Sequence, residues 1–235
     1  EFFLDGQHVF MSGSVMGRSV DVLLDTGAGA TVIDSALAAD LELPLSGALT
    51  AQGVAGQQSF SFVEVGEYEV AGVRMQGQRL AVLPLDASFY PSTGHHIGLI
   101  LGHDFTSRFI TILDYGNRTI AFRDPSSFEY LGEGRALEVS MFHGLPTIGA
   151  VLEDSIEAPL IVATGAGGGI HLTPGFVERH PGFLDGRPTV SAVVQGVGGE
   201  DTATVFRMGG VSLGGLRAPG GLSSVSSMGD VIASE

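Results

Sequence analysis

Short apolar runs recur along the whole chain and are interrupted about every ten residues by Gly, Asn, Asp or Pro. Such runs, rich in valine and bounded by turn residues, favour strands over helices. The clearest case is a predicted hairpin in which 109–115 and 118–122 are strands. Gly116 and Asn117 lie between them and both tolerate a positive φ, so we expect a two-residue turn. The pattern therefore predicts an all-β protein.

Helices are expected only as short pieces. One is predicted over 33–43, where Ser35 is a candidate N-cap, and the other over 173–180, where Pro174 suits a first helical position. Each predicted helix follows closely after a Thr-Gly turn. These two positions are the first sign that the chain repeats itself.

The repeat is visible in the sequence of the two turns. Residues 22–29 read VLLDTGAG and residues 160–167 read LIVATGAG. Downstream, 52–56 (QGVAG) match 195–199 (QGVGG), and at the same offset Gly66, Val70 and Gly72 match Gly209, Leu213 and Gly215. A fainter echo relates Leu101-Gly102 to Met228-Gly229. Duplication of this kind is evidence about architecture that a single motif does not supply.

Two lobes follow from the repeat. We predict an N-terminal lobe over 1–130 and a C-terminal lobe over 131–235, with the boundary inside 123–140, which contains Pro125, two adjacent serines after it and a pair of glycines around Glu133. The second lobe ends before any counterpart of the 109–122 hairpin, so we expect it to be truncated at its end. The chain starts at Glu1 without a basic segment followed by an apolar one, as in a mature or trimmed fragment.

The amino-acid composition limits the classes of function that we expect for this chain. The chain has 235 residues, of which 44% are hydrophobic and 16% charged, as in a packed globular protein. The formal net charge of −15 would repel phosphate backbones and anionic lipid heads, so nucleic acid is not an expected partner. The apolar stretch 158–172 is too short and too rich in glycine to cross a bilayer, so no membrane insertion is expected. Because there is no cysteine, composition leaves both periplasm and cytosol open.

Taken together, the motifs resemble the retropepsin-like aspartic peptidases, in the bacterial form that fuses two such lobes in one chain. The resemblance rests on the apolar strand before Asp25, on the sequence DTGA from that residue, on the glycine-rich segment from Gln52, and on Leu101-Gly102. It implies two pseudo-symmetric closed β lobes, pepsin-like in arrangement, with a few short helices and a central substrate cleft. One Asp-Thr-Gly loop from each lobe would meet at the base of that cleft.

The resemblance assigns roles to these loops. Peptide hydrolysis without a metal needs a water held between a carboxylate that takes its proton and a carboxylic acid that polarises the substrate carbonyl. Two facing aspartates share one proton and supply both states. Asp25 is the expected acid in the first lobe, and position 163 is the expected place of its partner. The loops would be supported by Thr26, Gly27, Thr164 and Gly165.

Glycine-rich hairpins are expected to act as flaps over an extended peptide. In the first lobe the predicted flap residues are Gly53, Val54, Ala55 and Gly56. In the second lobe they are Gly196, Val197, Gly198 and Gly199. The expected reactants are water and a peptide or unfolded protein, with no cofactor and no metal. A monomer would suffice, because both lobes are in one chain. Similarity to the fused bacterial group also implies an exported, periplasmic protein.

This sequence departs from the family pattern at Ala163, which stands where the second aspartate belongs. We therefore predict that the chain as written does not hydrolyse peptides efficiently. An engineered Asp→Ala change is our hypothesis, because a naturally abandoned site would be expected to drift in its neighbouring Thr-Gly-Ala as well. The alternative is a natural pseudoenzyme that binds peptides without cleaving them. A lectin-like β protein, in which the hairpins are mere connections, is a third hypothesis.

Plainer interpretations exist for several residues. Asp25 alone reads as an acid capping a strand-to-turn transition, although that does not explain the duplication. The glycines of 165–169 suggest a phosphate cradle, but no Lys-Ser or Lys-Thr follows them. His95-His96 and His103-Asp104 lack a spaced third metal ligand, so we interpret them as surface loop residues. The acidic pairs Glu153-Asp154 and Glu200-Asp201 are interpreted as solvated loop charges, because adjacent strand residues point oppositely.

Overall fold

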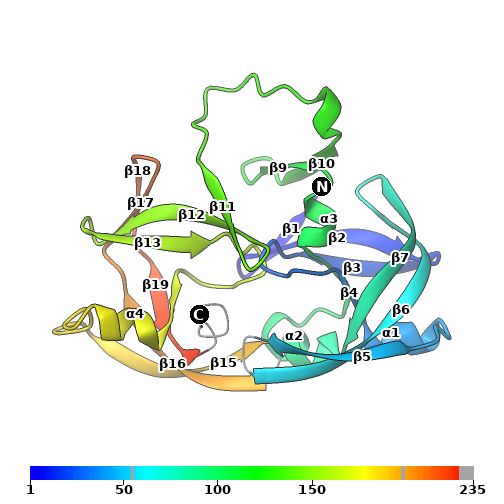
Figure 1. Cartoon of the computed structure of the whole chain (residues 1–235), viewed down its shortest axis with the longest axis horizontal. Coiled ribbons are helices and arrows are strands. Elements are labelled where there is room, and N and C mark those ends of the chain that lie inside the picture. Colours follow the sequence, from blue (N-terminus) through cyan, green and yellow to red (C-terminus); the bar gives the residue numbers. More distant parts are fainter. Residues whose placement is uncertain (54–55, 197–198, 228–235) are drawn as a thin grey trace.

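The computed structural model describes residues 1–53, 56–196 and 199–227. Most of the described chain is β-strand, arranged as two halves joined by a long exposed connection (Figure 1). In the first half the strands are β1 (Phe3–Asp5), β2 (His8–Val15), β3 (Arg18–Leu24), β4 (Val32–Asp34), β5 (Ser46–Gly53), β6 (Gly56–Val70), β7 (Val73–Leu83), β8 (Ile97–Leu101), β9 (Ile110–Asp114) and β10 (Thr119–Arg123). In the second half they are β11 (Val139–Phe142), β12 (Leu145–Leu152), β13 (Ile156–Ile161), β14 (His171–Leu172), β15 (Thr189–Gly196), β16 (Gly199–Arg207), β17 (Gly210–Leu213), β18 (Leu216–Pro219) and β19 (Leu222–Val225).

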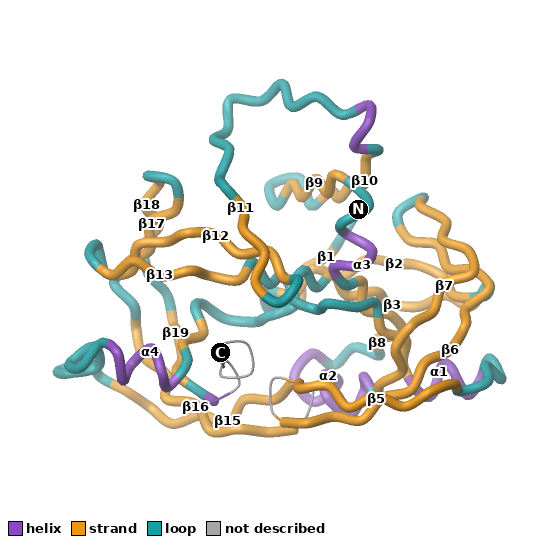
Figure 2. Tube along the Cα trace, in the orientation of Figure 1, coloured by secondary structure: helices purple, strands orange, loops and turns teal. Residues whose placement is uncertain are grey.

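Helices are few and short (Figure 2). They are α1 (Ser35–Asp40), α2 (Leu85–Thr93), α3 (His103–Thr106) and α4 (Pro174–Arg179), with a 3₁₀ turn at Pro125–Ser127. The helix predicted at 173–180 is confirmed, with Thr173 as N-cap and Pro174 in the first turn. The helix predicted at 33–43 is shorter, because Ile33 belongs to β4. Its N-cap is Asp34 instead of Ser35, since the Asp34 carboxylate accepts from the backbone N–H groups of residues 36 and 37.

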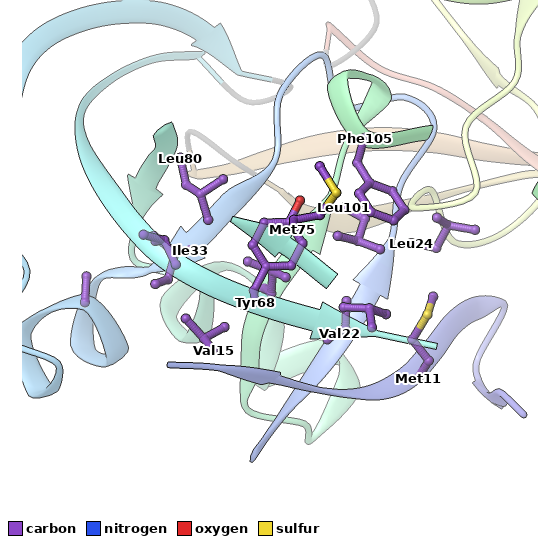
Figure 3. Close-up of a cluster of buried hydrophobic side chains, with 14 of the residues drawn as sticks. Met11, Val15, Val22, Leu24, Ile33, Tyr68, Met75, Leu80, Leu101 and Phe105 are labelled. Atoms are coloured by element: carbon purple, nitrogen blue, oxygen red, sulfur yellow. The ribbon is translucent and has the colours of Figure 1, made fainter. Parts of the chain in front are cut away.

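The first half contains an eight-stranded sheet in the order β1-β2-β3-β8-β4-β7-β6-β5 and a two-stranded sheet of β9 and β10. Three consecutive residues of β3, Val22, Leu23 and Leu24, are all completely buried. Because successive strand residues point to opposite faces, this requires apolar packing on both sides of the sheet. Val22 and Leu24 belong to one core cluster and Leu23 to another. Figure 3 shows the larger cluster, in which the Phe105 ring of α3 packs near Leu24 and Leu101. The unbroken apolar run before Asp25 is thus the mark of a strand buried on both faces.

In the second half the described strands form two smaller sheets. One contains β11, β12, β13, β17 and β18, and the other has the order β14-β19-β16-β15. Several pairings correspond between halves: β12 pairs antiparallel with β11, β13 and β17, just as β2 does with β1, β3 and β6. The β14–β19 pair is parallel, as is β4–β7. Within the described residues, no strand of the second half takes the place that β8 occupies beside β3.

The long connection between halves runs through 124–138 and is exposed apart from a half-buried Phe128. It contains the predicted lobe boundary, and Figure 1 shows it as an arch between β10 and β11. The division at 130/131 itself stays a prediction.

The hairpin predicted at 109–122 exists, but the two-residue turn is wrong. Asp114 pairs with Thr119, which leaves a four-residue connection in which Arg118 has a φ of 54°. The longer turn is stabilised by the Asp114 carboxylate, which accepts from the backbone and side-chain N–H groups of Asn117 at 2.9 and 2.8 Å. A side chain thus set the turn length that the Gly116-Asn117 pair alone did not predict.

Candidate active site

Two Thr-Gly loops from different halves meet in the middle of the molecule. Asp25 directly follows β3, and Ala163 comes two residues after β13. The first loop is fixed from behind by β8 and α3. The Asp25 N–H donates to the Leu101 carbonyl at 3.0 Å, and the His103 N–H donates to the Ala28 carbonyl at 2.7 Å.

Thr26 and Thr164 join the loops through reciprocal hydrogen bonds. The Thr26 N–H donates to Thr164 Oγ1 at 3.1 Å, and the Thr164 N–H donates to Thr26 Oγ1 at 3.2 Å. Each hydroxyl then donates onward to a carbonyl of the opposite half: Thr26 to Val162 at 2.5 Å and Thr164 to Leu24 at 2.8 Å. The network uses each threonine hydroxyl as donor and acceptor at once, so neither loop can shift without breaking bonds on both sides.

Glycines allow the loops to touch. A Cβ added at Gly165 would overlap the Asp25 carboxyl group, and one added at Gly27 would lie 2.7 Å from the Ala163 Cβ. Both glycines also hydrogen-bond to the Asp25 carboxylate, since the N–H groups of Gly27 and Gly165 donate to Asp25 Oδ1 at 2.8 and 3.2 Å. Asp25 Oδ1 and the Ala163 methyl group therefore both border Gly27.

Burial is the main influence on Asp25 and raises the pKa of its carboxyl group above the usual value. The backbone N–H groups of Gly27 and Gly165 oppose this, as do the charge of His8 and the N–H of Ala28. The net direction is upward, which suits a carboxyl group that must exchange a proton during a reaction.

Both predicted flap hairpins have their bases in the described structure. Gly53 pairs with Gly56 across β5 and β6, and Gly196 pairs with Gly199 across β15 and β16. Figure 1 shows both hairpins on the side of the molecule away from β9 and β10, and β15 packs against α2 of the first half. The remaining predicted flap residues, Val54, Ala55, Val197 and Gly198, lie outside the described residues.

Two histidines beside the second loop were not predicted from the sequence. Gly167 lies against the ring of His8, the first residue of β2, and its carbonyl accepts from His171 Nε2 at 2.8 Å. Both residues lie at strand starts, and His171 comes four residues after Gly167. The four-residue spacing between Gly167 and His171 was the signal that the sequence offered. The other partner of His171, Ser224 on β19, can be identified only from the structure.

Other charged residues have structural partners. His95 lies between Asp5 and Asp21, with ring nitrogens 3.3 and 3.6 Å from their carboxylates, so it is not a free surface residue. Among the described residues no group of three His, Cys, Asp or Glu side chains has the geometry of a metal site. In the same part of the chain no helix is long and apolar enough to span a bilayer.

The interpretation of Glu153 as a solvated loop charge is wrong. Its Oε1 accepts from Arg187 and from the Gly209 N–H, both at 2.8 Å. The Glu153 side chain is only 20% exposed. It links the β12–β13 turn to the start of β17. Its neighbour Asp154 is exposed but pairs with Arg217, so this acidic pair has a structural use in the second half.

Comparison with known proteins gives a partial match. Residues 11–105 match the family model described as aspartyl protease, which is less than half of the chain. No curated protein matches the chain. A similar solved structure is the crystal structure of a retropepsin-like aspartic protease from Rickettsia conorii, with 16% identity and a TM-score of 0.32 over 46% of this chain and 76% of that one. The matched segment contains Asp25, Thr26, Gly27 and Gly102, and it ends within α3.

Proposed function

We propose, from the aspartyl protease match of residues 11–105, that the whole chain carries the frame of an aspartic endopeptidase whose second acid is replaced by Ala163. In this proposal Asp25 and residue 163 form one site, and the chain as written lacks the carboxyl pair needed for hydrolysis. The substrate would be an extended peptide or an unfolded protein.

The reciprocal hydrogen bonds between Thr26 and Thr164 carry the proposal. They hold the two loops in contact, with Asp25 Oδ1 and the Ala163 methyl group both beside Gly27. A carboxyl group at position 163 would extend from a Cβ that already borders Gly27, beside the Asp25 carboxyl. Two carboxyl groups at such range share a proton, which is the state that activates a water and polarises a carbonyl.

Ala163→Asp is the direct test. We expect it to create hydrolysis of an unfolded protein between acid and neutral pH, with kcat/KM at least a hundredfold above the parent chain, since a positioned acid–base group contributes about 10²–10⁴. The matched control is Ala163→Asn, which has nearly the same shape but cannot ionise. No gain in a folded Ala163→Asp protein, or an equal gain in Ala163→Asn, would contradict the proposal.

A second candidate function is peptide binding without cleavage. The observation that favours it is that the inter-loop network is complete although one acid is missing. Binding of an extended peptide by the parent chain, together with no turnover by the folded Ala163→Asp protein, would support this alternative over the peptidase.

A further inference from the structure

The second Thr-Gly loop is tied to the sheet behind it by one side chain. His171 Nε2 lies 2.8 Å from the Gly167 carbonyl oxygen, and His171 Nδ1 lies 2.7 Å from Ser224 Oγ on β19. A carbonyl oxygen only accepts hydrogen bonds, so Nε2 must carry a proton. In the neutral ring Nδ1 then accepts from the Ser224 hydroxyl. The imidazole is thus fixed at both nitrogens and bridges the loop to the strand.

The first half has no such bridge at the corresponding place. His171 is paired with Ser224 across the parallel strands β14 and β19, whereas Ile33 is paired with Val82 across the parallel strands β4 and β7. There the loop is held by backbone groups of β8 and α3 and by the Gly102 N–H, which donates to Thr31 Oγ1 at 3.3 Å. The polar pair occurs in the half that lacks, within the described residues, a strand in the position of β8.

Gly167 is also confined on its other side. A Cβ added there would lie 3.0 Å from His8 Cε1, which is closer than ordinary packing permits. The His8 ring comes from β2 of the first half, and His171 comes from β14 of the second. The end of the loop therefore lies against two imidazoles, and His171 hydrogen-bonds to it.

We propose that His171 is a positioning residue that holds the 163–168 loop through the Gly167 carbonyl, so that residue 163 and the Gly165 N–H face Asp25. The bond at Gly167 acts two residues away from Gly165, whose N–H reaches Asp25 Oδ1 at 3.2 Å. Thr164 stays bonded to the first half, so loosening Gly167 frees the loop only after Thr164 and lets the Gly165 N–H turn away from the carboxylate. The catalytic consequence rests on the proposed function, whereas the effect on the Asp25 carboxyl does not.

The effect of removing this bridge is partial, because the chain after the loop has other bonds. The Ile170 N–H donates to Ser223 Oγ at 3.3 Å, and the Ser224 N–H donates to the Ile170 carbonyl at 3.0 Å. These bonds hold the start of β14 in place without His171. The freedom gained is confined to the loop, so we expect altered geometry at Asp25 instead of unfolding.

Two amide substitutions at position 171 distinguish the effect of side-chain length from the effect of side-chain polarity. The side-chain N–H₂ of Gln extends about as far as imidazole Nε2, so His171→Gln keeps a donor for the Gly167 carbonyl. His171→Asn is equally polar but one methylene shorter, and its N–H₂ reaches only the Nδ1 position. Thr173→Ala serves as a stability control, since it removes the N-cap of α4 nearby without touching the loop.

The first readout is the titration of the Asp25 carboxyl by ¹³C NMR in the chain as it exists. The Gly165 N–H lowers the pKa of Asp25, so its loss in His171→Asn should move the midpoint upward. We expect no shift in His171→Gln or Thr173→Ala. The second readout is turnover in the Ala163→Asp background, where His171→Asn should lower kcat about tenfold and His171→Gln should restore it.

An unchanged Asp25 midpoint in folded His171→Asn, or an equal shift in Asn and Gln, would overturn the inference. If Ala163→Asp has no activity, the proposed function fails and the NMR midpoint still decides the inference. If Ala163→Asp is active but indifferent to His171→Asn, the inference fails and the proposed function stands.

Discussion

The two halves hold their Thr-Gly loops in different ways. Behind Asp25 lies a buried strand, β8, whose Leu101 carbonyl bonds the loop directly. Behind Ala163 the described residues offer side chains instead, with His171 bonded to the Gly167 carbonyl and Ser223 to the Ile170 N–H. Between the loops the bonding is reciprocal, since Thr26 and Thr164 donate and accept in the same pattern. The halves are therefore alike at their contact and unlike in what supports it.

The second difference is chemical. Asp25 is a carboxyl group whose pKa is raised by burial and which accepts two backbone N–H groups, while its counterpart is a methyl group. In the proposed function, such an asymmetric pair keeps the geometry of one site but only half of its ionisable groups. Four experiments test how far the likeness and the difference extend.

Adding Asp25→Asn to the Ala163→Asp protein should have the largest effect. If the two acids work as a pair, kcat/KM should fall by about 10²–10⁴, because an amide can neither take nor give the proton. Steady-state cleavage of an unfolded protein measures this. A double variant as active as Ala163→Asp alone would mean that the acid at 163 works without Asp25.

Removing the N-cap side chain of one helix in each half compares how much each cap contributes to stability. Asp34 is 6% exposed and accepts from the N–H groups of Ala36, Leu37 and Leu85, so Asp34→Ala leaves buried donors unpaired. We expect it to lower the free energy of unfolding by about 2–4 kcal/mol. Thr173 caps its helix by accepting from the Phe176 N–H, and Thr173→Ala should cost about 1 kcal/mol. Urea denaturation measures both, and equal losses would contradict the expected difference.

The contact between the loops is tested by a double-mutant cycle. Thr26→Val and Thr164→Val each remove a hydroxyl that both donates and accepts across the contact, and each should cost about 1–2 kcal/mol. Because the two hydroxyls serve one network, the double variant should cost less than the sum of the two single losses. Strict additivity would show that the two threonines act independently. Thr→Ser at either position keeps the hydroxyl and serves as the control.

The pH dependence of thermal stability reports on the ionisation of Asp25, and we expect it to show the smallest effect. A carboxyl pKa raised in the folded state means that the unfolded chain ionises first, so the stability contributed by this group is full below the pKa of 3.8 that the carboxyl has in the unfolded chain. It is lost as pH rises through the folded pKa. Asp25→Asn removes this loss, so its melting temperature should exceed that of the parent at neutral pH. The two melting curves should converge below pH 3.8, and a constant difference at every pH would contradict this account.

Part of the fold and of the candidate site could be predicted from the sequence. The apolar run before Asp25 predicted a strand, and Pro174 after Thr173 predicted a helix start, because both signals act within a few residues. The Thr-Gly repeat placed residues 25 and 163 in equivalent loops before any contact between them was known. These successes depend on local physics and on internal similarity.

What the sequence did not reveal depends on partners distant along the chain. The bond from the Leu85 N–H to Asp34 and the bridge made by His171 require knowing which segments are neighbours. Glu153 appeared to be a loop charge because its partners, Arg187 and the Gly209 N–H, are far away in sequence. Nor did the repeat predict that His171 and Ser223 support the second loop, because similarity between the loops says nothing about the residues behind them.

The most direct test of the central claim is the ¹³C titration of the Asp25 carboxyl in the parent chain and in Ala163→Asp. If residues 25 and 163 share one site, the new carboxyl must couple to the old one, and the single-step Asp25 curve of the parent should become two coupled steps. An Asp25 curve that is unchanged by Ala163→Asp would show that the two positions do not share a site.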